Sequence, residues 1–265
     1  MTPYHVAIPS LGRSDTIQGK TIECLLKLGV KPSQIDIYVD DFEADLYRNK
    51  LEPSSYNKII SVKPCSLAEK RNYIHSNYRL GAKLIVCDDD LKGLLYKPHP
   101  ESTKLKEMNE AQWKNLVSNA FDCCETFGAT LWGVYPVVNA YFMKLNFSAD
   151  LRFIIGQLYG RIVDHSDETL LADTVKDDYE LTIKSFIKDN AVIRFNYVAV
   201  NSKVYSGVGG LSGIRTPELS AQAASYLTKN WPQYVATKVK LGKTGHVEVR
   251  LKSPWRKVYD VILDG

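Results

Sequence analysis

The amino-acid sequence predicts an α/β fold: one domain with a mainly parallel central sheet flanked by helices, and a small mixed C-terminal subdomain. Two observations lead to this prediction. Over roughly the first 90 residues, apolar runs alternate with helical patterns in the order strand, helix, strand, strand, helix, strand. The runs HVAI (5–8) and KLIVC (83–87) are continuously apolar, as is typical of strands buried on both faces of a parallel sheet.

The expected strands are short apolar runs bounded by turn residues. The first, HVAIPS, leads into a Pro-Ser-Leu-Gly turn, and the second, IDIYVDD, ends in the acids Asp40 and Asp41. Ligands of such sheets bind beyond the carboxyl ends of the strands, so polar residues there are candidates for function. Strands are expected at residues 5–10, 35–41, 57–64 and 83–87.

Two helices are expected between these strands. The segment 21–29, TIECLLKLG, has apolar residues at helical spacing and ends at Gly29, which suits a C-cap. The segment 66–81 begins with Ser66 and carries Glu69 three residues later, which is the spacing of a capping box.

The composition is that of an ordinary globular protein. Of 265 residues, 45% are hydrophobic, and no run approaches the roughly 18 apolar residues needed to cross a bilayer. The N-terminus lacks the layout of a signal peptide, so a cytoplasmic location is expected. Five scattered cysteines without a CxxC pair indicate neither a disulfide framework nor a zinc site. The net charge of +4 permits an anionic partner such as nucleic acid without requiring one.

Three consecutive aspartates, Asp88, Asp89 and Asp90, directly follow the apolar run KLIVC. Close carboxylates repel one another and raise each other's pKa unless a cation is present. Mg²⁺ and Mn²⁺ commonly bind one or two carboxylates together with substrate phosphates. A solvated acidic loop is the simpler alternative, but the position at a strand end favours a metal site.

The ordered set of motifs resembles the GT-A glycosyltransferases. The first strand ends in IPSLGR (8–13), the second strand ends in acids, and a helix carries EKRN (69–72). The aspartates 88–90 are similar to the family's Asp-x-Asp motif, and VKDDYELTIKSF (175–186) resembles its later acidic motif. The sequences of these motifs are most similar to those of the phage and TET/JBP-associated glycosyltransferases, which modify hydroxymethylated pyrimidines in DNA.

This resemblance implies a metal that bridges the two phosphates of a UDP-sugar. The implied metal ligands are Asp88, Asp90 and His246, with His165 as a weaker candidate, and the implied metal is Mn²⁺ or Mg²⁺. Contacts to the donor nucleotide or sugar are implied for Arg13, Asp40, Arg71, Asn72, Asp88 and Asp89.

The resemblance also places the acceptor's general base at the start of the helix over 177–189. Asp178 aligns best with the family aspartate, and Asp177 is the alternative. Acids at a helix N-terminus are also favourable through the helix dipole alone, so the pattern leaves a capping role open. With Asp178 as the base, an inverting mechanism would follow, although the residues do not decide between inversion and retention.

The implied organisation is a catalytic core over 1–200 and a C-terminal extension over 201–265 that completes the site. Within the core, residues 1–95 would bind the nucleotide sugar and residues 96–200 the acceptor. The glycine-rich stretches 205–218 and 156–161 are interpreted as loops near the site.

The expected activity is transfer of a sugar to the hydroxymethyl group of 5-hydroxymethylcytosine or hydroxymethyluracil in DNA. The basic segment 238–257 could meet phosphates, and Trp231 or Trp255 could stack on a displaced base. The alternatives are a polysaccharide, lipid or protein acceptor, a nucleotidyltransferase, and an inactive DNA-binding module of the same fold.

Overall fold

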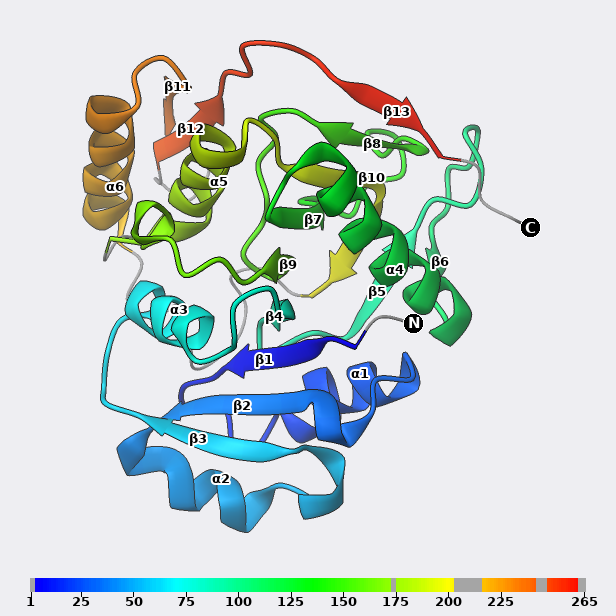
Figure 1. Cartoon of the computed structure of the whole chain (residues 1–265), viewed down its shortest axis with the longest axis vertical. Coiled ribbons are helices and arrows are strands. Elements are labelled where there is room, and N and C mark those ends of the chain that lie inside the picture. Colours follow the sequence, from blue (N-terminus) through cyan, green and yellow to red (C-terminus); the bar gives the residue numbers. More distant parts are fainter. Residues whose placement is uncertain (1–2, 173–174, 203–215, 242–246, 262–265) are drawn as a thin grey trace.

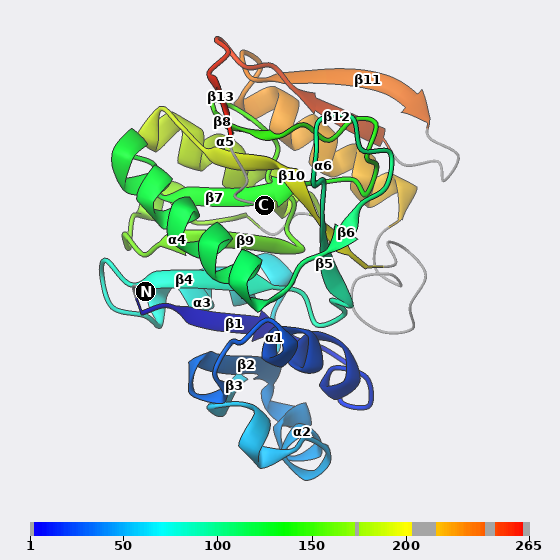
Figure 2. The same cartoon turned by 90° about the vertical axis from the view of Figure 1, so that its right-hand side faces the viewer.

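The computed structural model describes residues 3–172, 175–202, 216–241 and 247–261. Figure 1 shows one long twisted sheet with helices packed on its faces, and Figure 2 shows the strands stacked from β3 at the bottom to β8 near the top. The strands are β1 (His5–Pro9), β2 (Ile35–Asp40), β3 (Lys58–Val62), β4 (Lys83–Cys87), β5 (Gly93–Tyr96), β6 (Lys106–Glu107), β7 (Leu131–Tyr135), β8 (Asn146–Ala149), β9 (Leu158–Ile162), β10 (Ile193–Asn201), β11 (Val235–Leu241), β12 (Val247–Leu251) and β13 (Val258–Asp260). The helices are α1 (Glu23–Lys27), α2 (Ala44–Lys50), α3 (Leu67–Ser76), α4 (Glu110–Phe127), α5 (Asp177–Asp189) and α6 (Pro217–Asn230).

The central part of the sheet is mainly parallel, as predicted. The main path runs β13-β8-β10-β7-β9-β4-β1-β2-β3. Strands β1 to β4 are mutually parallel, and β9 is antiparallel to both β4 and β7. Strand β7 therefore points the same way as β4, and β10 is parallel to β7. Between β3 and β10, β9 is the one reversed strand in the described sheet.

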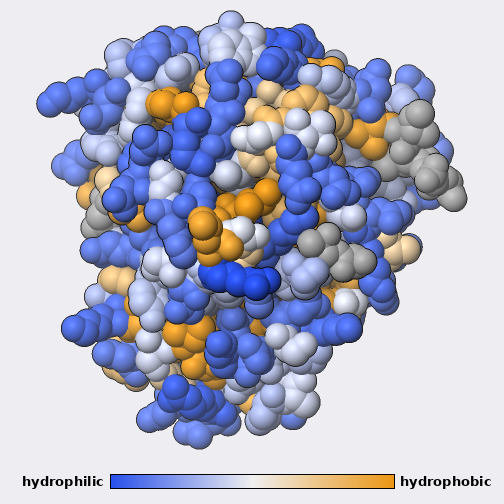
Figure 3. Space-filling view, in the orientation of Figure 1, coloured by the Kyte–Doolittle hydropathy of each residue, from blue (hydrophilic) through white to orange (hydrophobic). Residues whose placement is uncertain are grey.

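Both faces of the sheet are buried, which explains the continuously apolar strands. In β1, Val6 and Ile8 pack into one apolar cluster while Ala7 packs into the other. Successive side chains of a strand point to opposite faces, so a strand covered on both sides needs apolar residues at every position. The outer surface seen in Figure 3 is largely hydrophilic, with separate apolar patches.

The C-terminal part forms the small mixed subdomain that the sequence predicts. Strands β11 and β12 make a separate antiparallel hairpin. Ile183 of α5, Leu227 of α6 and Val249 of β12 share one small apolar cluster. The chain then returns to the main sheet, where β13 pairs with β8.

Local signals locate the first helices well. The Ser66 hydroxyl accepts a hydrogen bond from the Glu69 amide, and the Glu69 carboxylate accepts one from the Ser66 amide, so the predicted capping box is present. Gly29 follows α1 with φ of +76°, a left-handed conformation that favours glycine. Helix α2 was not predicted. Only Ala44 and Tyr47 of its seven residues are buried, so the sequence has almost no apolar repeat at helical spacing.

The prediction that residues 156–161 form a loop is wrong, because Leu158–Ile162 is strand β9 in the middle of the sheet. Its Gly160 does not serve a turn. A Cβ there would lie 2.0 Å from Trp132 Nε1, so the absence of a side chain admits the indole ring. The other glycine-rich stretch falls largely on 205–215, outside the described residues.

In the described part of the chain, no helix has both the length and the apolar character required to span a membrane.

Candidate active site

Three segments meet at the carboxyl edge of the parallel strands. Arg13 follows β1, Asp40 ends β2, and the aspartates 88–90 follow β4. Because β1 lies between β2 and β4 and is parallel to both, the carboxyl ends of the three strands are neighbours. Arg13 Nη1 lies 2.7 Å from Asp89 and 2.9 Å from Asp90, which joins two of these segments directly.

Asp89 is the inward member of the three aspartates. Its Oδ2 accepts a hydrogen bond of 2.6 Å from the Ser10 hydroxyl, and its Oδ1 accepts one of 2.7 Å from Arg13. Burial raises the pKa of Asp89, although Arg13 and Ser10 oppose that shift by stabilising the carboxylate. The observed contacts of Asp89 fasten the loop after β1 to the end of β4. Its contact with a nucleotide stays a prediction.

Asp88 and Asp90 face outward on either side of Asp89. Their side chains are 31% and 21% exposed, whereas Asp89 is buried. The pKa of Asp88 is raised to about 7, mainly by burial and also by the neighbouring carboxylates of Asp89 and Asp90, against the opposing effect of Arg71 at 3.5 Å. Together with Asp89 and Asp177, these two carboxylates share only the guanidinium groups of Arg13 and Arg71, so the cluster has an excess of negative charge that a cation would relieve.

The fit of a metal ion to this site depends on ligands from outside it. Among the described residues, no three His, Cys, Asp or Glu side chains are arranged to hold a metal. Two carboxylates suffice for Mg²⁺ or Mn²⁺ when donor phosphates supply further oxygens, so Asp88 and Asp90 fit this use. His246 lies outside the described residues, and its role as a third ligand stays a prediction.

His165 cannot be a ligand of the same metal, which corrects the weaker candidate named from the sequence. It follows β9, whose end at Ile162 pairs with Lys83 at the start of β4. Asp88 follows the opposite end of β4, about 16 Å away at the usual rise of a strand. The His165 ring instead contacts the carbonyl oxygen of Tyr78 at 2.6 Å.

Arg71 connects α3 to α5 and to the aspartates. Its guanidinium forms a salt bridge with Asp177, donates a 3.0 Å hydrogen bond to the carbonyl of Gly156, and approaches Asp88. A Cβ at position 156 would lie 2.7 Å from Arg71 Nη2, so Gly156 makes room for this group. Burial alone would lower the pKa of Arg71, but the surrounding groups, Asp177 first among them, together outweigh burial and raise it. The observed partners of Arg71 are protein groups, and its contact with the donor stays a prediction.

The two candidate bases at the start of α5 have different environments. Asp177 is buried and held by Arg71. Asp178 is partly exposed, and its Oδ1 accepts a hydrogen bond of 2.9 Å from the Tyr179 amide. Of these two candidates, Asp177 is therefore held in a buried ion pair and Asp178 is partly exposed to solvent.

The remaining predicted residues of α3 are also engaged. Lys70 Nζ lies 2.6 Å from Asp40 Oδ1, and both side chains are buried. The Asn72 amide donates to the Leu171 carbonyl and accepts from the Leu171 amide, both at 2.9 Å, so Asn72 fastens the segment that precedes α5. Donor contacts of Asp40 and Asn72 stay predictions.

Two residues that were not predicted hold the aspartate segment in place. The Thr21 hydroxyl donates to the Asp88 carbonyl and accepts from the Leu91 amide, both at 2.9 Å. The Gln157 carbonyl accepts a hydrogen bond of 3.0 Å from the Asp88 amide. No local signal could have identified Thr21, because it is 67 residues from its partner.

The chain is similar in fold to solved structures of other proteins, although its sequence matches no family. No family model matches the sequence, and no curated protein matches it. The residue 1–349 fragment of S. aureus TarS, solved in complex with UDP-GlcNAc, superposes with a TM-score of 0.52 at 13% identity, covering 86% of this chain and 67% of that one. The chain has the GT-A fold.

A second solved structure has weaker similarity. Glucosyl-3-phosphoglycerate synthase from Mycobacterium tuberculosis, in complex with Mn²⁺, UDP-glucose and phosphoglyceric acid, gives a TM-score of 0.49 at 14% identity, covering 96% of this chain and 88% of that one. The chain spans 40% of the longer TarS structure.

Proposed function

We propose that this protein is a metal-dependent glycosyltransferase that moves a sugar from a UDP-sugar to the hydroxymethyl group of 5-hydroxymethylcytosine or hydroxymethyluracil in DNA. The observation that carries this proposal is the pair of outward carboxylates, Asp88 and Asp90, at the carboxyl edge of β4 in a GT-A fold. Carboxylates outnumber arginines at this edge, and Mg²⁺ or Mn²⁺ commonly binds one or two carboxylates together with substrate phosphates.

The donor would lie over the carboxyl ends of β1, β2 and β4. Mn²⁺ or Mg²⁺, when bound, would neutralise the negative charge that develops on the departing diphosphate. Asp88, Asp90 and His246 would hold this ion. Arg13 would meet the phosphates, since its planar fork suits phosphate oxygens and Asp89 already orients it toward this edge. Other donor contacts would come from Asp40, Arg71, Asn72 and Asp89.

Asp178 is the preferred general base. In the transfer step, the acceptor hydroxyl oxygen forms a bond to the anomeric carbon while the bond from that carbon to the phosphate oxygen breaks. UDP leaves with the electron pair, and the hydroxyl proton passes to the base. Asp177 is less suited because its carboxylate is buried against Arg71, whereas Asp178 is accessible. Attack assisted in this way would invert the anomeric centre.

The DNA acceptor rests on the motif resemblance and on the basic segment 238–257. A hydroxymethyl group at C5 of a pyrimidine points into the major groove, so the enzyme would have to reach or displace the base. The protein would act in the cytoplasm, that of the host cell if it is encoded by a phage. Residues 1–200 would form the catalytic core, with residues 201–265 completing the site.

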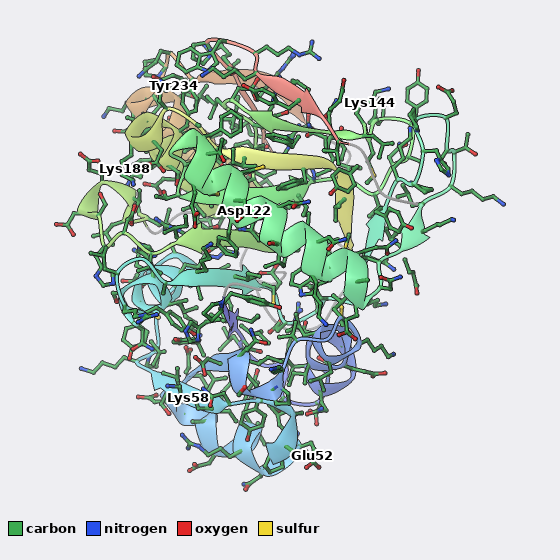
Figure 4. The ribbon with its side chains drawn as sticks, turned by 45° about the vertical axis from the view of Figure 1, so that its right-hand side comes forward. Glu52, Lys58, Asp122, Lys144, Lys188 and Tyr234 are labelled. Atoms are coloured by element: carbon green, nitrogen blue, oxygen red, sulfur yellow. The ribbon has the colours of Figure 1, made fainter. Side chains whose placement is uncertain are left out.

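The test is incubation of the protein with Mn²⁺, a panel of UDP-sugars and duplex DNA containing 5-hydroxymethylcytosine, followed by mass spectrometry of the nucleosides. A hexose or N-acetylhexosamine mass shift is expected, and Asp90→Ala should abolish it. Asp122→Ala is the matched control, because Asp122 is an exposed acid on α4 (Figure 4) and should leave the product unchanged.

Other outcomes separate the alternatives. Slow hydrolysis of UDP-sugar without modified DNA would indicate a transferase with a polysaccharide, lipid or protein acceptor. Binding of DNA without any stabilisation by UDP and Mn²⁺ would indicate an inactive DNA-binding module. Absence of UDP binding would contradict the proposed donor site.

A further inference from the structure

An exposed apolar loop leaves the sheet after β7. We define the apolar loop as residues 136–143, PVVNAYFM. Within it Tyr141 is 79% exposed and Phe142 is 56% exposed, and both Val137 and Val138 are also exposed. Single exposed apolar residues are ordinary on a protein surface, but four within six positions form a contiguous apolar patch, which is typical of an interaction site.

The apolar loop is held in a defined conformation. The buried side chain of Lys97 donates hydrogen bonds to the Ala140 carbonyl at 2.9 Å and to the Met143 carbonyl at 3.3 Å. Met143 is fully buried beneath the loop, and the Asn139 carbonyl accepts hydrogen bonds from the Phe142 and Met143 amides. The exposed aromatic side chains are therefore presented by an anchored turn.

The register of the sheet places the start of this loop at the same edge as the candidate active site. Gly133 of β7 and Val86 of β4 both pair with Tyr159 of the intervening strand β9. Two residues further on, Tyr135 is level with Asp88 at the same carboxyl edge. Two strand spacings separate them, which is about 10 Å. The loop thus begins at the same edge as the aspartates, and it ends at Lys144, whose amide donates to the Asn196 carbonyl of β10, on the far side of β7 from β4.

The chemistry of the loop suits a planar ring attached to phosphates. The Tyr141 and Phe142 rings are 5.1 Å apart at 83°, so together they offer one ring face and one ring edge at right angles to it. Lys144 follows the loop directly and is exposed (Figure 4). Lys106, also exposed, pairs with Tyr96, which precedes the anchoring Lys97.

We infer that the apolar loop is a docking platform for the acceptor nucleic acid, on which Tyr141 and Phe142 stack against a base while Lys144 and Lys106 meet phosphates. This inference rests on the proposed function. Stacking on exposed aromatic rings is tolerant of base identity, and lysines near such rings neutralise the backbone. Nucleic acid held there would extend along the same edge of the sheet toward Asp88 and the donor.

The test measures affinity for fluorescein-labelled DNA containing 5-hydroxymethylcytosine by fluorescence anisotropy. The variants are the double substitution Tyr141→Ala with Phe142→Ala, and the conservative Tyr141→Phe. Leu80→Ala is the control, since Leu80 is an exposed apolar residue before β4, at the opposite edge of the sheet. The thermal unfolding midpoint of each variant checks that it is folded.

The double variant should bind DNA about 10-fold or more weakly, because each lost stacking contact removes a sizeable part of the affinity. It should also raise KM for DNA more than it lowers kcat. Tyr141→Phe keeps the ring and should lose at most a few-fold, and Leu80→Ala should match the wild type.

Unchanged DNA affinity in the folded double variant would overturn the inference, while UDP-dependent transfer in the same preparation would leave the proposed function standing. Conversely, loss of DNA binding in the double variant would support the platform even if no UDP-sugar were turned over. Binding of vesicles of anionic phospholipid but not of DNA, lost in the double variant, would overturn the inference in favour of a lipid surface.

Discussion

The ion pair between Arg71 and Asp177 should be the part of the site on which stability depends most. Both side chains are almost entirely buried, and the pair joins α3 to α5. Replacing Asp177 by asparagine leaves the Arg71 guanidinium buried without a full counter-charge. Breaking a buried pair by removing one partner costs about 3–5 kcal/mol. For a domain of this size, that loss lowers the unfolding midpoint by roughly 10 °C.

Two further variants turn this expectation into a decisive comparison. Asp178→Asn changes the next residue, which is partly exposed, so its midpoint should stay within about 2 °C of the wild type. If Asp178 is the base, that variant should lose transferase activity without losing stability. The double substitution Arg71→Met with Asp177→Leu removes both charges and should recover much of the stability lost in Asp177→Asn.

The assay is thermal unfolding by differential scanning calorimetry, with activity measured on the same samples. An unchanged midpoint for Asp177→Asn would refute the reasoning, because it would mean that the buried guanidinium finds compensation elsewhere. A midpoint for the double variant below that of Asp177→Asn would show that the apolar replacements do not pack in the space of the ion pair.

Two other predictions concern the fold itself. Gly160→Ala places a Cβ 2.0 Å from Trp132 Nε1 and should lower the free energy of unfolding by about 1–3 kcal/mol or more. Gly19→Ala is the control, because a Cβ at position 19 would have no neighbouring atom within 4 Å and should leave the stability unchanged. Chemical denaturation measures the free energy of unfolding of both variants. Asp164 is partly buried, yet hydrogen bonds from His75 and Lys188 lower its pKa below the usual range. As the pH falls, Asp164 is therefore protonated at a higher pH in the unfolded state than in the folded state. The free energy of unfolding should decrease as the pH drops below about 4. Asp164→Asn should flatten this pH dependence in urea titrations; an equally steep loss in the variant would exclude Asp164 as its source.

The sequence by itself determined the elements whose signals are local. The capping box of Ser66 and Glu69, the left-handed Gly29 and the continuously apolar strands all depend on residues within a few positions of one another. The order of the elements placed the aspartates at the carboxyl edge, because parallel strands end at the same side of a sheet.

Only the tertiary structure decided which groups meet. Arg71 and Asp177 are 106 residues apart, and no periodicity or cap links them. The inward direction of Asp89 follows from its contacts with Ser10 and Arg13, and the exclusion of His165 follows from the reversed direction of β9. Strand register and the packing of helices on the sheet set these contacts, and both depend on the whole chain at once.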